Sequence, residues 1–160
     1  MASIRQARSE DLPRMQEIAI LAWTPIYTLY EHLMGRPLFH RLYPDWKAEK
    51  SSQVSSHLMK HPQWAYVVEE ADEVVGFLTY SLDDAKKIGE IGNNAVHPEH
   101  QNRGLGEMMH REALRRFRES GMLYAKVGTG LDDAHIPARR AYEKIGFKQI
   151  FRNVQYFMKL

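Results

Sequence analysis

The order of hydrophobic and polar positions along the chain predicts an α/β protein. Helical stretches carry apolar residues at intervals of three and four, as in the series Leu12, Met15, Ile18, Ala19 and Ala22. Strand stretches are short, rich in β-branched and aromatic residues, and bounded by Gly, Pro, Asn or Asp. The predicted strands cover residues 4–7, 64–70, 74–81, 88–96, 122–130, 147–152 and 154–160. The predicted helices are the one that carries the series above and those over residues 25–34, 45–61, 105–120 and 136–145.

Proline and glycine mark the ends of several of these helices. Pro25 is expected to break or kink the first helix, because proline cannot donate the backbone hydrogen bond that a helix interior needs. Thr24 would then cap a second helix that Gly35 ends, and a connection containing proline would follow. Gly121 is placed to stop the helix over 105–120.

Composition narrows the class of protein. The 160 residues suit one domain, 1–160, and no repeat or linker divides them. There is no cysteine, and no pair of histidines at i, i+4 spacing makes a zinc site, so no metal site is predicted. The formal net charge is only +2, with acidic and basic residues interleaved, and no apolar run suggests a signal peptide or a membrane span. We therefore expect a cytoplasmic protein that binds neither nucleic acid nor a membrane.

A glycine-rich turn after the strand over 88–96 is the strongest chemical signal. The pattern Gln101-x-x-Gly104-x-Gly106 leads directly into a helix, so backbone N–H groups and the positive end of the helix dipole could hold a phosphate. A nucleoside-triphosphate loop is excluded because Glu107 and Met108 stand where Lys and Ser or Thr are required. A dinucleotide fingerprint would need a glycine at Gln101. Alone, such a turn could also simply reverse the chain.

Two motifs resemble those of the GCN5-related N-acetyltransferases, the GNAT superfamily. The first is the family's pyrophosphate loop, matched here by Val96, Pro98, Gln101, Gly104 and Gly106. The second is the family's A-x-x-x-Y-E-K-x-G-F segment, matched by Ala138, Tyr142, Glu143, Lys144, Gly146 and Phe147. One departure from the pattern is His135, because the family commonly has asparagine there.

The resemblance implies a fold and a co-substrate. The fold is a single α/β domain with a mixed, mostly antiparallel twisted sheet of about seven strands and helices on both faces. Strands four and five would splay apart, and the pantetheine arm of acetyl-CoA would lie in the opening. The segment 92–95 carries one glycine and two asparagines, which favours a bulge, although Asn93 and Asn94 could equally be ordinary edge residues.

The resemblance also implies site residues. Tyr142 would donate a proton to the departing thiolate, and the backbone near Ala95 and Val96 would polarise the thioester carbonyl. The cofactor-binding residues would be Ala95, Val96, Gln101, Asn102, Arg103, Gly104, Leu105, Gly106 and His135. An alternative for Tyr142 is plain packing, because Ala138, Ala141, Tyr142 and Ile145 form one apolar helix face. Tyr142 as the catalytic acid is the preferred interpretation.

Glu90 is the predicted catalytic base. It lies six residues before Val96, where the histone-acetylating branch of the family carries its catalytic glutamate, and it could act through a water molecule. The alternative is a solvent-facing charge at the start of a strand. Arg103 could pair with a phosphate of coenzyme A.

The predicted function is therefore N-acetyl transfer from acetyl-CoA, with no metal, to a primary amine of a small molecule or a peptide by direct attack in a ternary complex. By the resemblance, the aromatic stretch from Trp23 to Tyr43 and the loop from Leu82 to Lys87 would surround the acceptor, and core packing is the alternative role of these aromatic residues. The alternative is a regulatory or interaction module that binds acetyl-CoA without catalysis. A homodimer is left open.

Overall fold

The computed structural model describes residues 1–160, and a five-stranded sheet in the order β1-β2-β3-β4-β5 forms its centre. The strands are β1 (Ser3–Gln6), β2 (Ala65–Glu70), β3 (Glu73–Asp83), β4 (Ile88–Val96) and β5 (Tyr124–Val127). The first four strands pair antiparallel, and β5 pairs parallel with β4. The predicted mixed, mostly antiparallel sheet is confirmed, but it has five strands rather than about seven.

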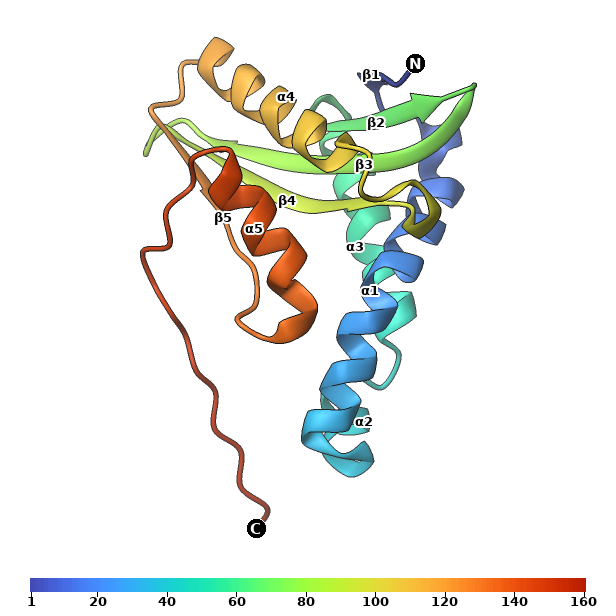
Figure 1. Cartoon of the computed structure of the whole chain (residues 1–160), viewed down its shortest axis with the longest axis vertical. Coiled ribbons are helices and arrows are strands. Elements are labelled where there is room, and N and C mark those ends of the chain that lie inside the picture. Colours follow the sequence, from blue (N-terminus) through green and yellow to red (C-terminus); the bar gives the residue numbers. More distant parts are fainter.

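Helices cover both faces of this sheet (Figure 1). They are α1 (Leu12–Met34), α2 (Arg36–Leu42), α3 (Trp46–Lys60), α4 (Leu105–Glu119) and α5 (Ile136–Lys144). One buried cluster joins α1 and α3 to the sheet, with Met15, Ile18, Val54 and Phe77 among its members. A second cluster joins α4 to the opposite face. Each face therefore has its own hydrophobic core, which holds the strands in register between two layers of helix.

Two sequence predictions about the first helices are wrong. The predicted separate helix over residues 25–34 does not exist, because α1 runs from Leu12 to Met34 with Pro25 inside it. Thr24 does not cap a new helix, because its hydroxyl donates back to the carbonyl of Ile20 at 2.7 Å. Stacking of Tyr27 on Trp46 of α3 anchors the part of α1 beyond the proline, so packing outweighs one missing hydrogen bond. The predicted stop at Gly35, where φ is +76°, is confirmed.

The connection predicted after Gly35 is partly helical. The short helix α2 forms with Pro37 in its first turn, where a proline costs no hydrogen bond. It is followed by α3, whose first turn is capped by the Asp45 carboxylate accepting from the N–H of Ala48 at 3.0 Å. None of the helices combines the length and the apolar character needed to cross a bilayer.

The predicted final strands over 147–152 and 154–160 are wrong. Beyond α5 the chain has no regular secondary structure, and residues 148–160 are exposed and run away from the sheet (Figure 1). Their alternating apolar residues favour an extended chain, but a strand exists only when a neighbour accepts its backbone hydrogen bonds. This segment pairs with no strand, so β5 is the edge of the sheet.

Candidate active site

The glycine-rich turn joins the end of β4 to the start of α4. A short 3₁₀ turn over Pro98–His100 follows β4, and then the backbone enters the left-handed region at Asn102 (φ +62°) and Gly104 (φ +81°). The first intrahelical bond of α4 runs from the N–H of Met108 to the carbonyl of Gly104. No side chain caps this helix, so the N–H groups of its first turn, from Leu105 onward, lack a partner within the helix.

The space above this turn is open. A methyl group built at Gly104 or Gly106 would meet no other atom within 4 Å. Gln101 fastens the turn to the strand, because its Nε2 donates to the carbonyl of Val96 at 3.1 Å. Arg103 lies at the rim, donates to the carbonyl of Glu99 at 3.2 Å, and keeps more than half of its side chain exposed. An uncapped helix end under open space is able to bind a phosphate group.

A β-bulge in β4 decides which way the next side chains point. Opposite Thr79 of β3, the strand β4 has two residues, Gly92 and Asn93, where a regular ladder would have one. The extra residue exchanges the faces of all residues that follow it. Asn93 consequently lies on the α3 side of the sheet and Asn94 on the α4 side, as their hydrogen bonds to Lys50 and His110 show.

Beyond the bulge, β4 has no neighbour on its outer side. It pairs with β5 only from Ile88 to Ile91, although β4 itself continues to Val96. The sequence predicted that these two strands separate, and their pairing indeed stops after four residues of β5. The backbone of residues 92–96 therefore faces an opening instead of a strand.

The ladder pattern identifies which backbone group faces that opening. The N–H of His97 donates to the carbonyl of Val75 of β3 at 2.8 Å. Because inward and outward groups alternate along an antiparallel strand, the N–H and carbonyl of Val96 point away from β3. The same alternation directs the N–H of Ala95 toward β3. The ladder thus favours Val96 over Ala95 as a hydrogen-bond donor to a ligand.

Tyr142 of α5 reaches this segment of β4 from the α4 side. Its side chain is only 7% exposed, and its hydroxyl oxygen accepts a hydrogen bond from Asn94 Nδ2 at 3.2 Å. Burial raises the pKa of Tyr142, and the bond from Asn94 opposes that rise. The phenol therefore stays protonated at neutral pH. It also packs against Phe147, the first residue after the Gly146 turn that ends α5.

His110 of α4 completes this group of contacts, and the sequence analysis did not find it. Its ring lies 4.8 Å from that of Tyr142, and its Nε2 lies 3.0 Å from Asn94 Oδ1. Burial lowers the pKa of His110 from 6.5 to about 4, and its Nδ1 has no partner. The available signal was a histidine next to Met109 on the apolar face of α4, where a polar residue needs a reason.

Glu90, the predicted base, lies where β4 and β5 are still paired. Its carboxylate forms an ion pair with Lys126 of β5 at 3.0 Å, and its side chain is 44% exposed. Gly89 and Ile91 face α4, so alternation places Glu90 on the face that carries α1 and α3. It is thus on the opposite face of the sheet from Tyr142.

His135 lies just before α5 and outside the glycine-rich turn. Its Nδ1 contacts the carboxylate of Asp132 at 2.8 Å, and its ring lies 6.4 Å from that of Tyr30 of α1. The structure therefore places His135 between α5 and α1, and its role toward a cofactor stays a prediction.

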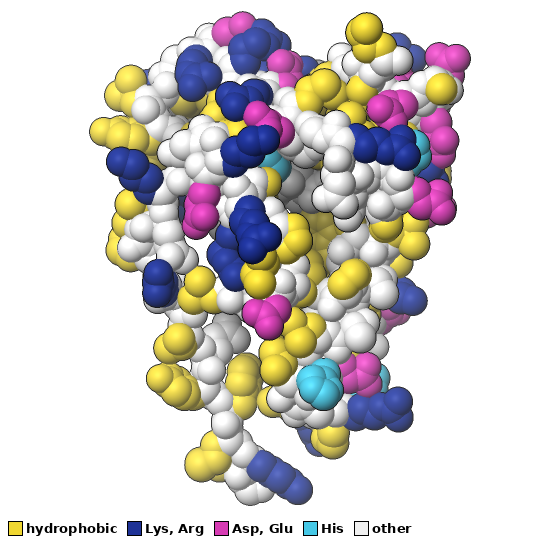
Figure 2. Space-filling model, in the orientation of Figure 1, with side chains coloured by type: hydrophobic (Ala, Val, Ile, Leu, Met, Phe, Trp, Pro, Cys, Tyr) yellow, Lys and Arg dark blue, Asp and Glu magenta, His cyan; other side chains and the backbone are white.

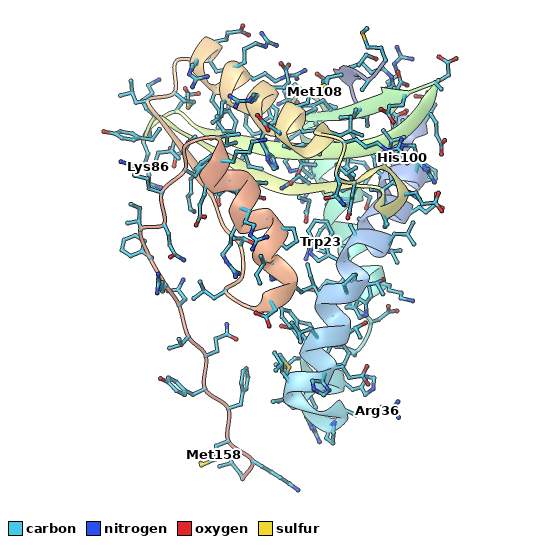
Figure 3. The ribbon with its side chains drawn as sticks, in the orientation of Figure 1. Trp23, Arg36, Lys86, His100, Met108 and Met158 are labelled. Atoms are coloured by element: carbon cyan, nitrogen blue, oxygen red, sulfur yellow. The ribbon has the colours of Figure 1, made fainter.

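Aromatic side chains of α1, α2 and the start of α3 pack together in one cluster. Tyr27 lies at its centre and touches Tyr30, Phe39, Tyr43 and Trp46. Between α1 and α5 the surface is hollowed and lined by hydrophobic side chains (Figure 2). Trp23 of α1 points into the space between these helices (Figure 3). This is the stretch predicted to surround an acceptor.

Lys50 of α3 is a buried cation beside the bulge that the sequence did not reveal. It is 7% exposed, and its ammonium donates to Gln53 Oε1 at 2.9 Å and to Asn93 Oδ1 at 3.1 Å. It also lies 4.3 Å from the centre of the Trp23 ring. Burial lowers its pKa, and the negative charge of Glu49 only partly opposes that fall. No cluster of three or more His, Asp or Glu side chains is arranged to hold a metal ion.

Comparisons with known proteins identify the family and the fold of this chain. The sequence model of the family described as "Acetyltransferase (GNAT) family" matches residues 23–147. No curated protein sequence gives a significant match.

Three solved structures illustrate the similarity of fold. The PaiA N-acetyltransferase of Thermoplasma acidophilum, in complex with coenzyme A, is 18% identical, with 92% of this chain and 90% of that one covered and a TM-score of 0.76. Ard1 of Thermoplasma volcanium is 22% identical, with 92% and 82% covered and a TM-score of 0.69. A GNAT family acetyltransferase of Brucella melitensis, in complex with acetyl-CoA, is 21% identical, with 93% and 84% covered and a TM-score of 0.64.

Proposed function

This chain belongs to the GNAT family of acetyltransferases, and from that premise we propose that it transfers the acetyl group of acetyl-CoA to a primary amine of a small molecule or a peptide. The resemblance inferred from the sequence is confirmed by the family match, and with it the prediction of an acyltransferase. The amine acceptor and the roles of individual residues belong to the proposal.

One observation carries it. The uncapped N-terminus of α4 opens at the end of a strand, β4, whose last residues have no neighbour on one side. A pyrophosphate bound at the N–H groups from Gly104 onward would direct the rest of the ligand along that unpaired edge. The coenzyme A and acetyl-CoA complexes among the similar structures support this choice of ligand.

The residues at this edge suit acetyl transfer. Acetyl-CoA supplies the acetyl group as a thioester. The N–H of Val96 donates a hydrogen bond to the thioester carbonyl oxygen, which gains negative charge as the amine attacks. Tyr142 gives its proton to the sulfur when the carbon–sulfur bond breaks, and Glu90 receives the proton of the amine through a water molecule. The amine approaches from the hollow between α1 and α5 (Figure 2).

Binding of acetyl-CoA is tested by replacing Gly104 with valine. The φ of +81° and the close approach of a phosphate both need a residue without a side chain, so affinity for acetyl-CoA should be lost. Gly121→Val is the matched control, because Gly121 has φ +74°, equally open space, and a place at the other end of α4. Both variants carry a similar backbone strain.

Thermal unfolding with and without acetyl-CoA measures the difference. The unchanged protein and Gly121→Val should gain about 2.7 kcal/mol at a ligand concentration of a hundred times Kd, and Gly104→Val should gain nothing. Equal stabilisation of the two variants would contradict the assigned ligand site. Release of free coenzyme A in a panel of amines then tests the transfer reaction itself.

A further inference from the structure

Three polar side chains from three elements meet in one line, in which the partly buried Asn94 joins the buried His110 and Tyr142. Asn94 of β4 is bonded to His110 of α4 on one side and to Tyr142 of α5 on the other. Sixteen residues separate Asn94 from His110, and forty-eight separate it from Tyr142. His110 and Tyr142 are both nine-tenths buried or more. A buried polar chain of this kind is costly unless each member is satisfied, so its hydrogen-bond directions are informative.

The direction of the Asn94 amide follows from its neighbours. Its NH₂ group lies 3.1 Å from the carbonyl of Gly92, which can only accept, so the amide nitrogen must point that way. The second N–H of the same group then donates to the hydroxyl oxygen of Tyr142. The amide oxygen is left to face His110.

The protonation of His110 follows in turn. Asn94 Oδ1 can only accept, so the Nε2 of His110 must carry a hydrogen and donate it. Nδ1 is buried and has no partner, and an unprotonated ring nitrogen is tolerated there at lower cost than an N–H group. The low pKa that burial gives His110 keeps the ring neutral at physiological pH.

The consequence concerns the proton of Tyr142. Its oxygen accepts from Asn94, so its own hydrogen is not used by that contact and is free to be donated elsewhere. If the Asn94 amide were reversed, its oxygen would accept the Tyr142 hydrogen and hold it inside the protein. His110 opposes this reversal, because a reversed amide would present N–H to N–H.

We propose that Asn94 and His110 are positioning residues that keep the hydroxyl hydrogen of Tyr142 directed at the ligand. The proposal rests on the proposed function, in which Tyr142 protonates the leaving sulfur. It assigns a catalytic purpose to the bulge in β4, because without the extra residue Asn94 would face α3. The competing interpretation is that the three side chains only pack together.

Asn94→Asp separates the two interpretations. Aspartate has the shape of asparagine but no N–H, so it would accept the Tyr142 hydrogen instead of donating to its oxygen. We expect kcat to fall by about a hundredfold at pH 8 with an unchanged KM for acetyl-CoA, because the proton is withheld only from the chemical step. Asn153→Asp, the same change in the exposed C-terminal segment, should have no effect on kcat.

The pKa of Tyr142 gives a readout that needs no turnover. It is followed by ¹³C NMR of the tyrosine ring carbon bearing the hydroxyl, assigned with Tyr142→Phe. Two factors shift the pKa of Tyr142, namely burial and the hydrogen bond from Asn94. The titratable side chain whose ring contacts that of Tyr142 is His110. Asn94→Asp should raise this pKa, because the neutral phenol gains an acceptor and the phenolate loses a donor.

His110 is tested with a pair of variants. His110→Gln keeps an N–H near the position of Nε2 and should restore kcat to within about threefold of the unchanged protein. His110→Leu fills the space but cannot donate, and should lower kcat about tenfold, the scale of one hydrogen bond. This pair decides the question even if Asn94→Asp does not fold.

The outcomes are distinct. An unchanged kcat and an unchanged Tyr142 pKa in folded Asn94→Asp would overturn the proposal, as would equal kcat values for the two His110 variants. If the unchanged protein transfers no acetyl group to any amine, the proposed function fails, while the Tyr142 pKa still decides whether Asn94 orients the hydroxyl.

Discussion

Among single residues, Tyr142 combines a buried side chain with a hydroxyl hydrogen that its contact with Asn94 does not use. It contacts His110 and Asn94, and its oxygen accepts a hydrogen bond from Asn94, which leaves its own hydrogen unused by that contact. Burial raises its pKa, so the proton remains on the oxygen at neutral pH and is available to the charge that develops on the leaving sulfur. A residue of this kind can act at a late stage of the reaction without taking part in binding.

Tyr142→Phe should separate binding from chemistry. The affinity for acetyl-CoA should be nearly unchanged, while kcat should fall by about a hundredfold, the usual effect of losing one positioned proton donor. Steady-state rates and a coenzyme A titration on the same variant measure the two quantities. Tyr156→Phe makes the same chemical change at an exposed position and serves as the control. A wild-type kcat in Tyr142→Phe would rule out the proton-donor role and leave Tyr142 as a packing residue.

Glu90 is paired with Lys126, which gives it a structural alternative to the role of base. If it accepts the amine proton, Glu90→Gln should lower kcat/KM by roughly a hundredfold near neutral pH and by less at high pH, where free amine is abundant. Lys126→Met breaks the same ion pair but keeps the carboxylate. Equal pH profiles for the two variants would show that only the ion pair matters.

Among the elements, α4 connects the cofactor turn to the core. Leu105, Met109, Ala113 and Phe117 form its buried face, spaced four residues apart, and Arg and Glu side chains pair along its exposed face. The helix lies so close to β4 that a methyl group at Gly89 would collide with the Phe117 ring. Its start at Gly104 is therefore held in place by packing more than three turns away.

Gly89→Ala should disturb this contact. The added methyl group has no room beside a buried aromatic ring, so we expect the free energy of unfolding to fall by about 1–3 kcal/mol in urea denaturation. Gly128→Ala adds the same atom where none lies within 4 Å and should be close to neutral. Similar stability of the two variants would mean that α4 can shift away from the sheet without cost.

For the whole molecule, the buried His110 links stability to pH. Its pKa is about 4 in the folded chain and 6.5 when exposed, so between these values the unfolded chain binds a proton that the folded chain excludes. The free energy of unfolding therefore decreases as the pH falls through 6.5, and this decrease ends below about pH 4. Its size is about 3 kcal/mol, from 1.36 kcal/mol for each pH unit.

Denaturation of the unchanged protein and of His110→Gln at pH 7 and pH 4.5 isolates this contribution. Carboxylates titrate alike in both proteins, so the loss of stability between the two pH values should be smaller in the variant. The comparison uses the change with pH within each protein, so any packing cost of the substitution cancels. A loss of equal size in both proteins would mean that His110 is not kept neutral by burial.

What the sequence determined by itself is local. The turn at Gly104, the helix stop at Gly121 and the periods of α3 and α4 depend on residues a few positions apart, so the chain shows them directly. The one glycine and two asparagines after Ile91 indicated the bulge for the same reason. The family's motifs are of this local kind, which is why they predicted the cofactor turn.

Tertiary structure alone decided the rest. The line from His110 through Asn94 to Tyr142 joins residues from three elements. The burial of the Lys50 ammonium likewise depends on α1, α3 and β4 together. The continuation of α1 past Pro25 and the unpaired segment after Phe147 likewise depend on which partners are near. A hydrogen bond or a strand needs a partner brought close by the fold, and no local pattern specifies that partner.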